Sequence, residues 1–127
     1  MNERPLSPHL QIYRLPLTAI LSITHRITGV FVVVGIILLV LFLMGFAEGG
    51  EQRFLSIQSF LRSSLGRLSL WAWICALFFH LCHGVRHLIW DTGHGFSRAT
   101  MSRFAYLEIA ASIILTLMVF GLTRIES

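Results

Sequence analysis

The run VFVVVGIILLVLFLMGF, residues 30–46, sets the fold class of this chain, because it contains no charged and no hydrogen-bonding side chain. As an α-helix, at about 1.5 Å per residue, the run reaches about 25 Å. The turns before it complete the roughly 30 Å that the hydrocarbon core of a bilayer requires. We therefore predict one membrane-spanning helix over about residues 17–47.

Outward from this run, two more apolar segments have the length of a span, at about residues 67–90 and 104–123. Trp71, Trp73 and Trp90 mark the ends of the first of them, as the aromatic belts of membrane proteins do. Glu108 is expected near the start of the second. The sequence thus predicts an all-α membrane protein whose three transmembrane helices form a single domain over the whole chain.

The connecting segments are polar. Residues 1–16 contain all three prolines and are expected to form an extended arm, since each proline removes a backbone donor and restricts its predecessor. Residues 48–66 are expected to form a polar connection. Within it, Phe54, Ile57 and Leu61 recur at helical spacing and predict a short helix at the membrane interface.

The composition favours a membrane protein over a soluble or nucleic-acid-binding one. The chain is 55% hydrophobic, with a mean hydropathy of +0.75, which is more apolar surface than a soluble domain of this size can bury. Its ten basic residues are all arginines and form no clustered basic face for a nucleic acid. Six of them, Arg86 included, lie on the side of the arm and the second loop, and four lie on the other side. This count favours a cytoplasmic N-terminus.

A row of polar residues follows one face of the second predicted helix. At about 100° per residue, His80, Gly84, His87 and Asp91 share that face, His83 lies beside it, and Arg86 points well away. Each polar group that lies in lipid without a hydrogen-bond partner raises the free energy by about several kcal/mol. The row must therefore meet protein, water or a cofactor.

His80 has two interpretations. A neutral imidazole at this depth is suited to be an axial ligand of haem iron, and the alternative is a histidine that is hydrogen-bonded inside a helix bundle. For the haem, a second ligand has to come from another chain, because residues 104–123 contain no histidine and His25 is expected to lie nearer the membrane border. His87, one turn closer to the surface, can bond a haem propionate, whereas His83 can simply face a neighbouring helix.

The predicted helix over residues 17–47 carries a second polar face, formed by Ser22, Arg26 and Gly29 with His25 beside it. A hydroxyl and a guanidinium one turn apart can hold a carbonyl oxygen or a carboxylate. The alternative is an arginine that reaches to lipid phosphate while the serine bonds back to its own helix. Helical spacing alone does not separate these two interpretations.

Two motifs together identify a resemblance. RPLSPH at residues 4–9 is followed by SITHRITG at residues 22–29, and HLCHGVRHLIWD occupies residues 80–91. Together they resemble the large cytochrome b556 anchor subunits of succinate dehydrogenase, respiratory complex II, over nearly the whole chain. In that family the subunit pairs with a small membrane anchor subunit, and the two dock the flavoprotein and iron–sulfur subunits to the lipid bilayer.

The resemblance implies specific roles. His80 matches the axial ligand of haem b, whose other ligand comes from the small anchor subunit. Ser22 and Arg26 match the residues given to the ubiquinone site, while His25, Arg26 and His87 lie near the haem propionates. The resemblance thus implies a subunit of an enzyme, a succinate:ubiquinone oxidoreductase, which lacks the succinate site itself.

One alternative function is a haem-free membrane scaffold that only docks soluble redox subunits. The N-terminus lacks the layout of a transit peptide, which favours a bacterial inner membrane over a mitochondrial one.

Overall fold

The computed structural model describes residues 14–125, and all regular secondary structure within them is helical. Three helices follow one another: α1 (Leu17–Arg62), α2 (Ser64–Asp91) and α3 (Arg98–Ile125). Each is long and apolar enough to cross a membrane, so the predicted all-α architecture with three spans is confirmed. The predicted arm, residues 1–16, lies outside the described residues except for its last three, which are not helical.

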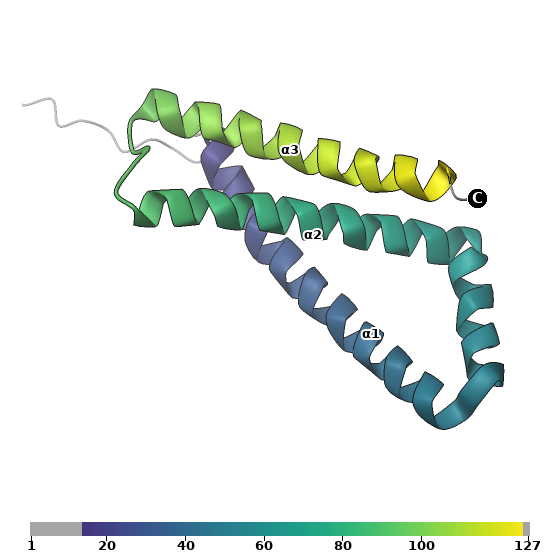
Figure 1. Cartoon of the computed structure of the whole chain (residues 1–127). Coiled ribbons are helices and arrows are strands. Elements are labelled where there is room, and N and C mark those ends of the chain that lie inside the picture. Colours follow the sequence, from purple (N-terminus) through teal and green to yellow (C-terminus); the bar gives the residue numbers. More distant parts are fainter. Residues whose placement is uncertain (1–13, 126–127) are drawn as a thin grey trace, which may run out of the picture.

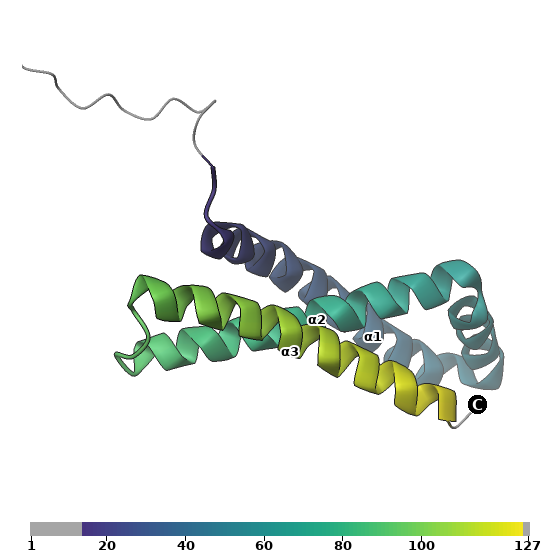
Figure 2. The ribbon, with the colours of Figure 1, turned by 90° about the horizontal axis from the view of Figure 1, so that it is seen from above.

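Helix α2 lies between the other two helices (Figure 1). It packs on α1 and on α3, whereas α1 and α3 touch each other much less. Seen from above, α1 passes across α2 at an angle (Figure 2). The start of α1, the end of α2 and the start of α3 lie toward the same end of the molecule, so the polar stretches of α1 and α2 meet there.

The interior of the molecule is polar and its outside is apolar. Among the described residues, the buried apolar side chains are few and mostly small, while two charged residues, a histidine and a serine are equally buried. Most of the large apolar side chains are exposed, as hydrocarbon requires. The buried polar residues are His83, Arg86, Glu108 and Ser112.

Helix α1 bends sharply at Gly50, whose φ of 58° and ψ of −151° suit glycine and few other residues. After the bend the chain returns toward α2 as a helical segment that ends at Arg62. A helix was predicted within residues 48–66, and the structure has one there, joined to the first span without an intervening loop. Helix α2 begins at Ser64, slightly before the expected residue 67, because the Ser63 hydroxyl accepts a hydrogen bond of 3.1 Å from the Gly66 amide.

Helix α3 begins at Arg98, six residues before the expected residue 104. The cause is a cap at Ser97, whose hydroxyl accepts a hydrogen bond of 3.2 Å from the Thr100 amide. Gly93 and Gly95, with φ of 81° and 88°, turn the chain between α2 and α3. The second loop is therefore short, and α3 is longer than its apolar run.

Helices α1 and α2 cross in close contact at Gly35. The indole nitrogen of Trp73 on α2 donates a hydrogen bond of 3.3 Å to the carbonyl oxygen of Val32 on α1. A Cβ atom on Gly35 would overlap that indole. The absence of a side chain at Gly35 therefore sets how closely the two helices approach.

Substituting Gly35 by valine should destabilise the protein by about 1–3 kcal/mol, because the indole of Trp73 and the backbone of α1 must separate. The measurement is the unfolding of the detergent-solubilised protein in a denaturant titration. Gly121→Val on α3 is the matched control, because the added Cβ would have no described atom within 4 Å apart from its chain neighbours and the nearby backbone of α3. Equal stability of the two variants would contradict the assignment of the helix crossing to Gly35.

Candidate functional site

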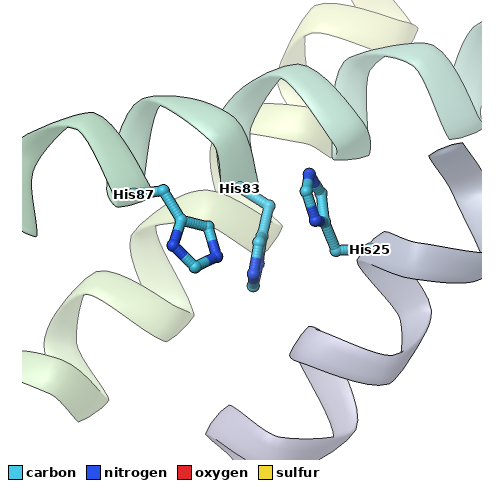
Figure 3. A group of neighbouring side chains, drawn as sticks. All are labelled: His25, His83 and His87. Atoms are coloured by element: carbon cyan, nitrogen blue, oxygen red, sulfur yellow. The ribbon is translucent and has the colours of Figure 1, made fainter.

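Four histidines from two helices form one cluster, which we call the imidazole row: His25 of α1 and His80, His83 and His87 of α2. The His25 ring lies between two others, stacked on His80 at 4.0 Å between centroids and on His83 at 4.4 Å. The His87 ring meets the edge of His83 at 4.9 Å. Figure 3 shows His25 pointing from α1, and His83 and His87 from α2, into the space between the two helices.

Gly29 allows the rings of His25 and His80 to approach. A Cβ atom on Gly29 would lie 2.9 Å from Cε1 of His80, closer than a Cβ normally comes to another heavy atom. Without it, Nδ1 of His80 lies 3.2 Å from the carbonyl oxygen of His25. A carbonyl oxygen only accepts hydrogen bonds, so Nδ1 carries the proton and the lone pair of His80 is on Nε2. That nitrogen can bind a metal ion.

A buried ion network joins α2 to α3. Nδ1 of His83 lies 2.9 Å from Oε1 of Glu108, and Nη1 of Arg86 donates to Oε2 of Glu108 at 2.7 Å. The exposed fractions of His83, Arg86 and Glu108 are 1%, 3% and 5%. Nε2 of His83 is buried and has no hydrogen-bond partner among the described residues. His83 is thus held at one nitrogen and free at the other.

This network gives Arg86 partners that the sequence analysis did not assign. Arg86 was counted among the arginines on the side of the N-terminal arm, and its guanidinium is buried against Glu108 and over the Trp90 ring. The role of Glu108 was missed. A carboxylate inside a predicted span was the available signal, since such a group is costly in lipid unless it is paired.

The position of His25 bears on the axial pair. Its ring is stacked on the His80 ring, with centroids 4.0 Å apart and an interplanar angle of 11°. Rings stacked this closely leave no space for an iron ion between them. Within the described residues, His25 therefore does not complete an axial pair with His80.

Nitrogens of His25, His83 and His87 lie within 4.8 Å of one another, which raises the possibility of a small metal ion. Zinc needs about 2.0–2.1 Å to each nitrogen, with the ring planes directed at the ion. The His25 and His83 rings are stacked instead, so their in-plane lone pairs run side by side. Coordination of one ion by all three requires these rings to turn.

A groove of about 500 Å³ runs beside the imidazole row. Arg26, which is exposed, lines it together with His25, Gly29 and His80, and valines of α1 form the rest of its wall. Ser22 is half-buried one turn earlier on α1 and is not among the residues that line the groove. Apolar walls with a guanidinium and two imidazoles suit a flat, largely apolar ligand that carries oxygen atoms.

The residues present also fit a haem. The site offers imidazoles as ligands, and Nε2 of His25 is buried without a hydrogen-bond partner. A Cβ atom on Gly84, which lies between His80 and His87 on α2, would have no described atom within 4 Å apart from its chain neighbours and the nearby backbone of α2. The α2 surface beside His80 is therefore open to a large flat group.

A larger groove of about 590 Å³ lies between α1, its returning segment and α2. Its lining is almost wholly apolar and includes Phe31, Phe42 and Trp73, with no charged side chain. This lining suits acyl chains, and it has no side chain suited to acid–base catalysis or metal binding.

The chain is similar to known proteins over nearly its whole length. Residues 1–119 match the family of succinate dehydrogenase/fumarate reductase transmembrane subunits. A succinate dehydrogenase cytochrome b556 subunit of Paracoccus denitrificans is 43% identical over 122 residues, covering 94% of this chain and 93% of the relative. One of Rickettsia felis is 38% identical, covering 94% and 92%. A cytochrome b560 subunit of Reclinomonas americana is 33% identical, covering 91% and 83%.

Replacing Arg86 by leucine should lower the free energy of unfolding by about 3–5 kcal/mol, because it leaves the Glu108 carboxylate buried without its cation. The same denaturant titration in detergent measures it. Replacing Arg86 and Glu108 together by leucine should recover most of the loss, since no unpaired charge is then buried. Arg103→Leu is the control, because Arg103 is exposed on α3. A loss in the double variant as large as in Arg86→Leu would contradict the ion pair.

Proposed function

Because the chain belongs to the family of succinate dehydrogenase/fumarate reductase transmembrane subunits, we propose that it anchors a succinate:ubiquinone oxidoreductase in the membrane as its cytochrome b subunit. It contributes one axial ligand of haem b and part of the quinone-reduction site. Its partners are a small membrane anchor subunit, an iron–sulfur subunit and a flavoprotein subunit. The complex lies in a bacterial inner membrane, with the N-terminus of this chain in the cytoplasm.

The observation that carries the proposal is the hydrogen bond between His80 and the carbonyl oxygen of His25. It fixes the His80 ring and leaves Nε2 as the ligand atom, in the manner of histidines that bind metals. Gly29 makes the hydrogen bond possible, and Gly84 leaves the neighbouring surface of α2 open. These features support His80 as the ligand that this chain supplies.

Burial favours His80 over His83 as that ligand. His83 is 1% exposed and is enclosed by Phe79, His25 and Glu108, so an iron shared with another subunit does not reach it. His80 is only half-buried and lines the groove. The second axial ligand comes from the small anchor subunit, because His25 is stacked on His80 and cannot oppose it.

Haem b supplies one-electron exchange when it is bound. His25, Arg26 and His87 are positioned in this proposal to hold its propionates. His25 has a buried Nε2 without a hydrogen-bond partner, while Arg26 and His87 are exposed. Charge-assisted hydrogen bonds from such groups are among the strong ones in proteins.

Ubiquinone binds in this proposal near Ser22 and Arg26. Its reduction takes two electrons, which succinate supplies through the iron–sulfur subunit, and two protons. Arg26 stabilises the negative charge that develops on a quinone oxygen, and Ser22 donates a hydrogen bond to it. The apolar wall of the groove lowers the local dielectric constant and strengthens both interactions.

Arg26→Leu should reduce succinate-driven ubiquinone reduction roughly tenfold to a hundredfold, which corresponds to the loss of a charged hydrogen bond worth about 1.5–3 kcal/mol. Electron transfer from succinate to a soluble dye should be unchanged, because it bypasses the membrane site. The assay uses the purified complex, with Arg103→Leu as the control. Equal loss of both activities would count against the quinone site.

His80→Leu should remove or reshape the b-type absorption spectrum of the complex, because the imidazole ligand is lost. The reduced-minus-oxidised difference spectrum is the measurement, and His94→Leu, a change at an exposed loop histidine, is the control. An unchanged spectrum would mean that His80 is not the ligand and that another histidine binds the iron. A parent complex without any b-type spectrum would favour the alternative, a haem-free scaffold.

A further inference from the structure

The proposed function assigns no role to the network of His83, Glu108 and Arg86. Its three side chains are almost fully buried, and one carboxylate bonds both α2 residues through its two oxygens. A carboxylate inside a membrane protein is costly even when paired, so an anchor that only packed helices would be served as well by apolar residues. The position of the network suggests a use for it.

Glu108 fixes the ring of His83. A carboxylate only accepts hydrogen bonds, so Nδ1 of His83 carries the proton and its ring plane is set by Oε1 of Glu108 at 2.9 Å. Arg86 holds the other oxygen at 2.7 Å and prevents the carboxylate from turning. The His83 ring is therefore held from α3.

The orientation of the His83 ring affects the other rings of the imidazole row through stacking. His83 stacks on His25 at 4.4 Å, and His25 stacks on His80 at 4.0 Å. The backbone carbonyl of His25 also accepts the hydrogen bond from His80. A change in the His83 ring consequently shifts the ring on which the proposed iron ligand rests, without any direct contact between Glu108 and His80.

Charge is the second route from Glu108 to the site. The carboxylate and the Arg86 guanidinium compensate each other inside the helix bundle. Loss of the carboxylate charge leaves the Arg86 guanidinium as an uncompensated buried cation near the imidazole row. The low dielectric constant there strengthens its electrostatic interaction with the haem site. A buried positive charge disfavours the oxidised form of a haem relative to the reduced form.

We propose that Glu108 is a positioning residue that, through His83 and His25, sets the ring orientation and the electrostatic surroundings of the His80 ligand, and thereby the redox potential of the haem. This inference rests on the proposed function, because it requires that His80 binds haem iron. It assigns to α3, which carries no histidine in the described residues, a part in tuning the cofactor.

The test is a redox titration and a low-temperature EPR spectrum of the purified complex with Glu108→Gln. This variant keeps the shape and loses the charge, so the haem midpoint potential should move to a more positive value. The g-values of the oxidised haem should also change, because they would report a change in the orientation of the His80 imidazole that holds the iron. Ser112→Ala is the control, since Ser112 is buried one turn further along α3 and bonds its own helix at the carbonyl of Ile109.

His83→Asn is the second variant, and it keeps the Arg86–Glu108 pair intact. It should change the g-values with a smaller shift in potential, because the ring is lost and the charges stay. A haem-loaded Glu108→Gln complex with the parent potential and g-values would overturn the inference, and so would a shift in Ser112→Ala as large as in Glu108→Gln. Should Glu108→Gln not assemble, parent g-values in His83→Asn would overturn it. Absence of haem from the parent complex would instead overturn the proposed function.

Discussion

The carboxylate of Glu108, held between Arg86 and His83, is the interaction on which the arrangement of the three helices depends. In lipid, the hydrophobic effect does not drive apolar helix faces together. The helices therefore associate through close packing and buried polar contacts. Here one carboxylate from α3 bonds two α2 residues one helical turn apart. Most large apolar side chains can then face outward, because the Glu108 carboxylate is paired inside the bundle.

Two glycines of α1 complete the arrangement by letting helices approach closely. Gly35 accommodates the indole of Trp73, and Gly29 accommodates the ring of His80. Since the two positions lie on the same helix, α1 is held against α2 at both, and His25 is brought between two α2 imidazoles. Structural packing and the proposed ligand geometry are in this way set by the same contacts.

The imidazole row limits the haem site proposed for this chain, because the described residues offer His80 no partner ligand. His25, the nearest histidine of α1, is stacked on His80 and so cannot take the opposite side of an iron ion. The half-buried face of α2 around His80 and Gly84 stays open toward the outside of the chain. In the proposed complex that face meets the small anchor subunit, while Ser22 and Arg26 of α1 serve the quinone.

The amino-acid sequence by itself determined the three spans, the polar row on α2 and the shared face of Ser22, Arg26 and Gly29, because hydropathy and a period of about 3.6 residues are local properties of a helix. Only the tertiary structure decided the partners of these residues.

Which side chains pair depends on the depth and the rotation of one helix against another. The residue at which a helix begins affects both. The cap at Ser97 starts α3 at Arg98, so Glu108 lies about 15 Å along the helix instead of near its start. There it reaches Arg86 and His83, while Gly35 and Gly29 set the depth at which His25 enters the imidazole row.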